Sequence, residues 1–152
     1  MTTSVADNAD HGLNAEEAAC ERWPLERVSG NGDEPDWFDA RFTEDCEAGL
    51  AGIVAEAGTP VEVKVCRLRY PDRFGRWWIK RANHERLLKA DGEYVLAVHE
   101  KGDVLRQGIL SAQTVDALIE GWWAAGDGGQ DADQFVQLPW SAVLDSVGGE
   151  QA

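Results

Sequence analysis

Apolar and polar side chains alternate along several stretches of the chain, as they do in strands with one buried face. The alternation is clearest at residues 36–42 and at the start of the stretch 61–70, where Val61, Val63 and Val65 share one face. Further strands are predicted at residues 25–28, 76–80, 93–99, 104–110 and 135–138. The third and fourth of these are separated by a short polar segment, which predicts a hairpin.

Apolar residues at helical spacing predict helices between these strands. The first helix follows Asn14, which can cap it together with Glu17, and it ends at Pro24. The others are predicted at residues 83–90, 111–123 and 141–144. Residues 43–58 are rich in Ala, Gly and Glu, and we expect a helical insertion or a long loop there. The order α-β-β-β-α-β-β-α predicts an α/β domain with helices packed on a mixed sheet.

The length of 152 residues fits a single domain, which we place at residues 11–145. Residues 1–10 and 146–152 are predicted to be disordered tails, and residues 124–134 a flexible acidic linker. No run of about eighteen apolar residues is present, so no membrane-spanning helix is expected. Three cysteines without a C-x-x-C spacing, together with the lack of a signal-peptide pattern, favour a reduced, cytoplasmic protein.

Charge is high and unevenly distributed along the chain. There are 28 acidic and 14 basic side chains, which give a net charge of -14, and most of the basic ones are arginines. A lysine-poor, acid-rich composition suits molar salt, where charges are screened within about 3 Å, so we predict a halophilic archaeal origin. Residues 61–90 nevertheless hold nine basic and three acidic side chains, a net charge of +6. This basic segment predicts a surface that docks phosphate, with scattered solvated arginines as the alternative.

Two charged side chains lie in the predicted strand at residues 61–70. Glu62 and Lys64 are two residues apart, so they share one face and lie about 7 Å apart along the strand. Such a pair in a central strand is costly to bury unless a further partner is present. A divalent metal is one such partner, because Mg²⁺ prefers carboxylate, carbonyl and water oxygens. Glu62, Asp39 from the preceding strand and the backbone carbonyl of Val63 are the predicted ligands. Lys64 would orient the attacking water, act as its base, or stabilise charge on phosphate.

Three segments resemble the PD-(D/E)XK nuclease superfamily, which includes many restriction endonucleases and the archaeal Holliday junction resolvases. Residues 11–16 (HGLNAE) resemble the opening helix of the resolvases, in which a glycine precedes a glutamate by four positions. Residues 37–40 (WFDA) resemble the strand that bears the first catalytic aspartate, and residues 60–64 (PVEVK) match the E-x-K strand. The resemblance covers residues 11–110 and implies a restriction-endonuclease-like αβββαβ core.

The resemblance implies a Mg²⁺- or Mn²⁺-dependent endonuclease that hydrolyses phosphodiester bonds of duplex or branched DNA, and a homodimer. Its implied site residues are Asp39, Glu62 and Lys64 for catalysis, with Glu16 assisting the metal. Asp36 competes with Asp39 for the first position, and we prefer Asp39 because it lies within the predicted strand rather than at its start. Glu17 is the alternative to Glu16.

Contacts with nucleic acid are predicted in the basic segment. The candidates are Arg67, Arg69, Arg73, Arg76, Lys80, Arg81 and His84. Trp77 and Trp78 lie among them, and at most one is expected to be exposed, where it could stack on unpaired bases. The other tryptophans near the C-terminus are interpreted as core residues or as anchors of a dimer interface.

Two other functions fit the same sequence. A catalytically inactive module of this fold would bind nucleic acid through the basic segment without holding metal. An α/β interaction protein with a coincidental E-x-K would bind neither metal nor nucleic acid. Titration with metal separates the first alternative from the endonuclease, and a DNA-binding assay separates the second.

Overall fold

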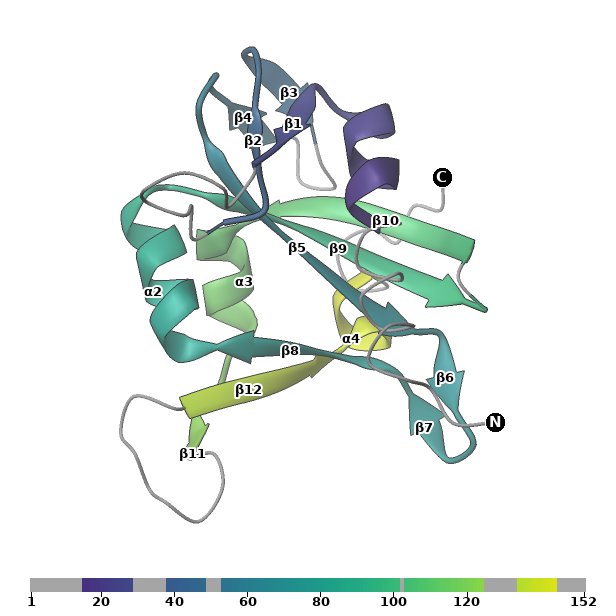
Figure 1. Ribbon diagram of the computed structural model, residues 1–152. Coiled ribbons are helices and arrows are strands. Elements are labelled where there is room, and N and C mark those ends of the chain that lie inside the picture. The colour runs from purple at the N-terminus through teal and green to yellow at the C-terminus, as the bar shows by residue number, and fades with distance from the viewer. Residues whose placement is uncertain (1–14, 29–37, 49–52, 102, 125–133, 145–152) are drawn as a thin grey trace.

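A computed structural model describes residues 15–28, 38–48, 53–101, 103–124 and 134–144 of the chain (Figure 1). The predicted tails at residues 1–10 and 146–152 lie outside these ranges, as does nearly all of the predicted linker at 124–134. Within the described ranges, no helix is long and apolar enough to cross a membrane.

A five-stranded mixed sheet forms the centre of the described chain, in the order β1-β2-β5-β9-β10. Its strands are β1 (Leu25–Arg27), β2 (Ala40–Phe42), β5 (Pro60–Arg67), β9 (Glu93–Glu100) and β10 (Asp103–Ser111). Strands β5 and β9 run parallel, and all other neighbours in the sheet are antiparallel. A helix at residues 15–22 precedes β1, and α2 (Arg81–Lys89) precedes β9. The predicted αβββαβ core and the α/β class are thereby confirmed.

A smaller antiparallel sheet has the order β11-β12-β8 and packs against the central sheet. Its strands are β8 (Arg76–Lys80), β11 (Trp123–Ala124) and β12 (Gln134–Pro139). Two short helices, α3 (Ala112–Leu118) and α4 (Trp140–Leu144), follow β10 and β12 respectively. In Figure 1, β8 and β12 run side by side below β5 and β9.

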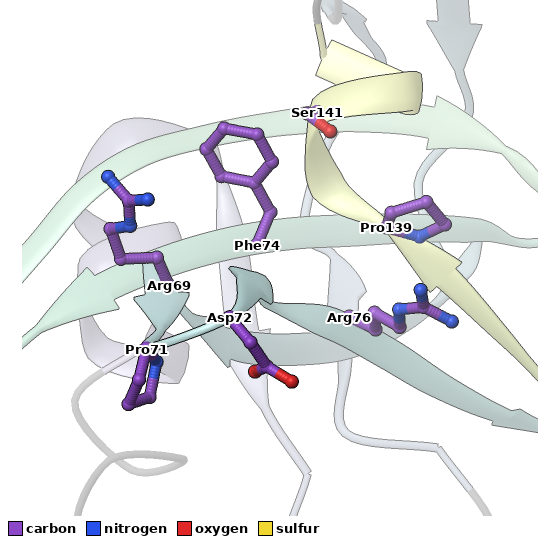
Figure 2. A pocket seen from close by; sticks show the side chains of 7 residues that line it. All are labelled: Arg69, Pro71, Asp72, Phe74, Arg76, Pro139 and Ser141. Carbon is purple, nitrogen blue, oxygen red and sulfur yellow. The ribbon is translucent and has the colours of Figure 1, made fainter.

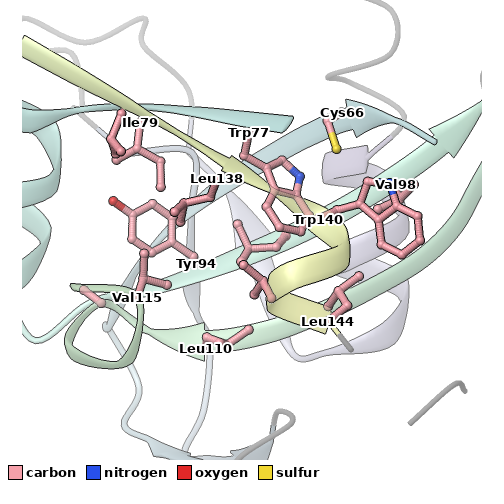
Figure 3. Packing of buried hydrophobic residues seen from close by; sticks show 14 of the residues in the cluster. Cys66, Trp77, Ile79, Tyr94, Val98, Leu110, Val115, Leu138, Trp140 and Leu144 are labelled. Atoms are coloured by element: carbon pink, nitrogen blue, oxygen red, sulfur yellow. The ribbon is translucent and has the colours of Figure 1, made fainter. Parts of the chain in front are cut away.

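The larger hydrophobic core fills the space between the two sheets (Figure 3). Trp77 is central to it, with 1% of its surface exposed, and its indole Nε1 donates a hydrogen bond to the Ala97 carbonyl at 2.9 Å. This bond ties β8 to the middle of β9. A second core cluster includes Ala19 of the N-terminal helix, Phe42 and Val61. Because both faces of the central sheet are covered, β9 is buried along almost its whole length.

The predicted helical insertion or loop at residues 43–58 is wrong. These residues contain an antiparallel hairpin of β3 (Cys46–Ala48) and β4 (Ile53–Ala55). Alanine and glutamate favour helices in isolation, but β-branched Ile53 and Val54 suit a strand, and pairing between strands overrides the local preference.

Three other predicted elements are shorter than expected. The strand predicted at residues 36–42 begins at Ala40, and the helix predicted to reach residue 123 ends at Leu118. The strand predicted at 61–70 ends at Arg67 and is followed by a small hairpin of β6 (Arg69–Tyr70) and β7 (Arg73–Phe74). Gly75 follows this hairpin, and a Cβ there would overlap the carbonyl oxygen of Arg67. The chain therefore needs glycine where it turns back beside β5.

Replacing Ser111 with alanine is expected to destabilise the fold modestly. The Ser111 hydroxyl caps α3 by accepting a hydrogen bond from the Thr114 amide at 3.1 Å. Loss of such a cap costs about 1 kcal/mol, which urea unfolding of the S111A variant would measure. Replacement by aspartate retains the cap, so a large loss in S111D as well would contradict this account.

Candidate active site

Asp39 approaches β5 where β2 stops pairing with it. The two strands pair only at Ala40↔Val61 and Arg41↔Pro60. Asp39 directly precedes β2, rather than lying within it as predicted, and its amide donates to the Val61 carbonyl at 3.0 Å. Its carboxylate Oδ2 accepts a hydrogen bond from the Val63 amide at 2.8 Å. The carboxylate is therefore fixed against the edge of β5 by a main-chain donor.

Glu62 and Lys64 share one face of β5, as the alternation predicted. The Lys64 Nζ lies 3.8 Å from Glu62 Oε2. Glu62 is 6% exposed, whereas about a quarter of the Lys64 side chain reaches solvent. The pair thus joins a buried carboxylate to an ammonium group that solvent can reach.

Three carboxyl groups influence one another at this edge. Burial, together with the nearby Asp39 and Glu16, raises the pKa of Glu62 to about 7 against the opposing effect of Lys64. Burial also raises the pKa of Asp39, against the effects of the Val63 amide and Lys64. The pKa of Glu16 is raised by burial and by Asp39, against Arg27. The edge therefore concentrates negative charge with few cations to offset it.

The geometry offers two carboxylates and one carbonyl to a metal ion. Peptide groups alternate along a strand, so the Val63 carbonyl points to the same side as that of Val61, which faces Asp39. Glu16 forms an ion pair with Arg27 at 3.1 Å. In the part of the chain that the structure describes, no three Asp, Glu, His or Cys side chains converge on one metal position.

The sequence offered Asp36 as an alternative to Asp39, and Glu17 as an alternative to Glu16. Asp36 lies outside the described residues. Glu17 is exposed on the N-terminal helix, whereas Glu16 is half-buried and its pKa responds to Asp39. Glu16 is therefore the helix carboxylate that interacts electrostatically with Asp39.

The predicted phosphate-contacting residues do not form one cluster. Arg67 is the last residue of β5 and Arg69 the first residue of β6, and their guanidinium groups lie over the rings of Tyr70 and Phe74 respectively. Arg73 belongs to β7. Arg76 and Lys80 are exposed on β8. Arg81 begins α2, where it forms an ion pair with Glu85 at 2.9 Å and hydrogen-bonds Gln134.

A pocket of about 370 Å³ opens beside the β6–β7 hairpin (Figure 2). Arg69 and Arg76 lie on either side of Phe74, and Ser141 also lines the pocket. Asp72 and two prolines complete the lining. Two guanidinium groups beside an aromatic ring suit an anionic ligand with a flat apolar part.

His84, a predicted phosphate contact, lies in the core rather than on the surface. The ring is fully buried, its Nδ1 lies 2.8 Å from the Tyr94 hydroxyl, and its Nε2 lies 2.9 Å from Asp116 Oδ1. An ionised carboxylate only accepts hydrogen bonds, so Nε2 donates to Asp116. Burial, with the fields of Glu62 and Asp116, raises the pKa of Tyr94. Neither Tyr94 nor Asp116 had a signal in the sequence.

Glu93 is expected to make stability depend on pH. It is 3% exposed, its Oε1 has no hydrogen-bond partner among the described residues, and burial raises its pKa from 4.5 to about 7. Between those values the folded chain binds more protons than the unfolded chain, so stability falls as pH rises. Glu93→Gln should stabilise the fold at pH 8 by as much as ~3 kcal/mol and leave it unchanged below about pH 4.5.

Urea unfolding of the wild type and Glu93→Gln at both pH values would measure this difference. Glu100→Gln is the matched control, because Glu100 is exposed at the end of the same strand. A pH-independent difference between Glu93→Gln and the wild type would contradict the assigned cause.

Comparison with protein families gives one finding: a model described as a PD-(D/E)XK nuclease superfamily domain matches residues 1–145. Comparison with curated proteins and with solved structures gave no significant match. The matched range includes Glu16, Asp39, Glu62 and Lys64, and every candidate residue of the basic segment.

Proposed function

Because the chain belongs to the PD-(D/E)XK nuclease superfamily, we propose that it is a divalent-metal-dependent endonuclease that hydrolyses phosphodiester bonds in DNA. One observation carries the proposal: Asp39 is fixed against the same strand that bears Glu62 and Lys64, through its 2.8 Å bond to the Val63 amide. Two acids and a lysine from separate segments are thus brought together on β5, beside the point where β2 stops pairing with it.

Asp39 and Glu62 are the residues that would hold Mg²⁺ or Mn²⁺, with the Val63 carbonyl as a third oxygen and Glu16 assisting. Mg²⁺ is commonly held by one or two carboxylates together with water and substrate phosphates, so two carboxylates suffice. The raised pKa values of Asp39 and Glu62 support this fit, because they reflect buried negative charge that a cation would offset. When bound, the metal would acidify a water molecule and offset charge on the phosphate.

The residues of the chain supply position and charge. The Val63 amide holds the Asp39 carboxylate in place and favours its ionised form. Lys64 Nζ lies close to Glu62 and reaches solvent, so it can donate a hydrogen bond to a phosphate oxygen that enters from outside. As the water oxygen bonds to phosphorus and releases a proton to solvent, the P–O bond to the leaving nucleotide breaks and the leaving oxygen takes up a proton from solvent. Lys64 stabilises the charge gathering on the phosphate oxygens.

The inactive nucleic-acid-binding module is the second candidate. The ion pair of Glu16 with Arg27 favours it, because that pair competes with any role of Glu16 toward metal. Calorimetric titration with Mn²⁺ separates the two candidates. The endonuclease predicts binding that is lost in Asp39→Asn, and the inactive module predicts no binding.

Cleavage of duplex, single-stranded and four-way-junction DNA tests the proposed activity. The acid-rich composition leads us to propose molar KCl for the assay, with Mg²⁺, Mn²⁺ or EDTA. Metal-dependent cleavage that disappears in EDTA is the expected result, and the preferred substrate would define the class of nuclease. Failure to cut any of the three with either metal would contradict the proposal.

A further inference from the structure

The outer face of the three-stranded sheet carries a row of exposed side chains that the proposed chemistry does not use. In β8, Trp77 and Ile79 point into the core, so Arg76, Trp78 and Lys80 point outward. Side chains two apart on a strand lie about 7 Å apart. The row therefore places an aromatic ring between two cations.

Three aromatic rings on this face form what we call the aromatic platform: Trp78, Phe135 and Trp123. Trp78 and Trp123 are 56% and 52% exposed, although large apolar side chains are usually buried. Trp78 stacks on Phe135 with ring centroids 4.5 Å apart and planes 10° from parallel, and Trp123 meets Phe135 edge-on at 5.8 Å. The rings hold one another in place while the tryptophans remain open to solvent.

Cations continue past both ends of the row. Beyond Lys80, Arg81 begins α2, with its guanidinium group 5.8 Å from the Trp122 ring. Beyond Arg76 lies the pocket that Arg69, Phe74 and Arg76 itself line (Figure 2). In a chain with a net charge of -14, the alternation of Arg76, Trp78 and Lys80 on the outer face of β8 calls for an anionic ligand with flat apolar parts.

We propose that this face binds an unpaired strand of DNA, with bases stacked on the aromatic platform and phosphates beside Arg76 and Lys80. Bases of a duplex stack on one another, whereas those of a single strand offer their faces to protein rings. The inference rests on the proposed function and deepens it, because it makes the preferred substrate DNA with a single-stranded segment. A two-fold dimer through this face is disfavoured, since antiparallel copies of β8 would bring Arg76 of one copy near Lys80 of the other.

Binding of a fluorescein-labelled twelve-residue oligothymidylate, followed by anisotropy in EDTA over a series of KCl concentrations, tests the inference. Trp78→Leu should raise Kd by about tenfold at every salt concentration, the effect of losing one stacked base. Trp78→Phe should bind nearly as the wild type does. Lys80→Glu should weaken binding and flatten the salt dependence, because fewer counterions are released. Lys89→Glu, an equal charge change at an exposed position at the end of α2, is the matched control.

The outcomes separate this inference from the proposed function. Undetectable binding by the wild type, or equal binding by Trp78→Leu and the wild type, overturns the inference whatever the cleavage assay shows. The inference is also overturned if the wild type binds no oligonucleotide but self-associates, and Trp78→Leu abolishes this self-association. That outcome would assign the face to a dimer. If binding follows the expected pattern but the protein cuts no DNA, the proposed binding face is supported and the proposed nuclease activity is contradicted.

Discussion

Replacing Glu62 with glutamine should lower metal-dependent DNA cleavage by about a thousandfold or more. A metal ion is worth several kcal/mol of transition-state stabilisation, and each 1.36 kcal/mol is a factor of ten in rate. Glutamine keeps the size of Glu62 but removes its charge, so the pair with Lys64 and the proposed hold on the metal are both lost. Single-turnover cleavage of the preferred DNA substrate would measure the effect.

Lys64→Met should cause a similar loss, because it leaves Glu62 and Asp39 in place but removes the cation that reaches solvent. Glu47→Gln provides a control of equal charge change at an exposed position of β3 and should cut as the wild type does. Oligothymidylate binding in EDTA should be the same in all these variants, which would show that they remain folded. Cleavage by Glu62→Gln at the wild-type rate would contradict the proposed catalytic role of Glu62.

Replacing Trp77 with alanine is expected to destabilise the fold by about 4 kcal/mol, the usual range for a large aromatic residue removed from a core. Trp77 is almost fully buried between the two sheets, and its indole satisfies the Ala97 carbonyl. The change would leave a cavity and remove the hydrogen bond from the indole to the Ala97 carbonyl. The midpoint of thermal unfolding should fall by on the order of 10 °C.

Trp78→Ala is the natural control for this prediction. The two tryptophans are neighbours on β8, yet one points into the core and the other to solvent. The exposed ring loses only its packing on Phe135, so we expect a cost of about 1 kcal/mol. Equal destabilisation by the two changes would mean that the inward and outward faces of β8 are assigned wrongly.

The elements that sequence reasoning predicted correctly are those with a strong local pattern. The E-x-K strand, the hairpin of β9 and β10 and the cap at Ser111 each carry their signal within a few residues. The family was also predicted correctly from such segments, and the match over residues 1–145 confirms it. The same alternation predicted that at most one of Trp77 and Trp78 would be exposed.

What escaped prediction depends on contacts between distant segments. His84 was interpreted as a surface residue, because nothing near it in the sequence shows that Tyr94 and Asp116 enclose it. The β3–β4 hairpin has residues with helical preferences, and only strand pairing decides its structure. Asp39 lies before β2 rather than within it, yet the sequence still identified it as the acid that meets β5.

The short pairing of β2 with β5 has a consequence for how the molecule loses activity. Two residue pairs join these strands, whereas seven join β5 to β9. Proteins open locally in units whose free energies lie below that of global unfolding. The segment with β1, β2 and Asp39 should therefore open at a lower free energy than β9, so that its amides exchange hydrogen faster. On warming, the proposed cleavage activity would be lost while the main core is still intact, and cooling would restore that activity without refolding of the core.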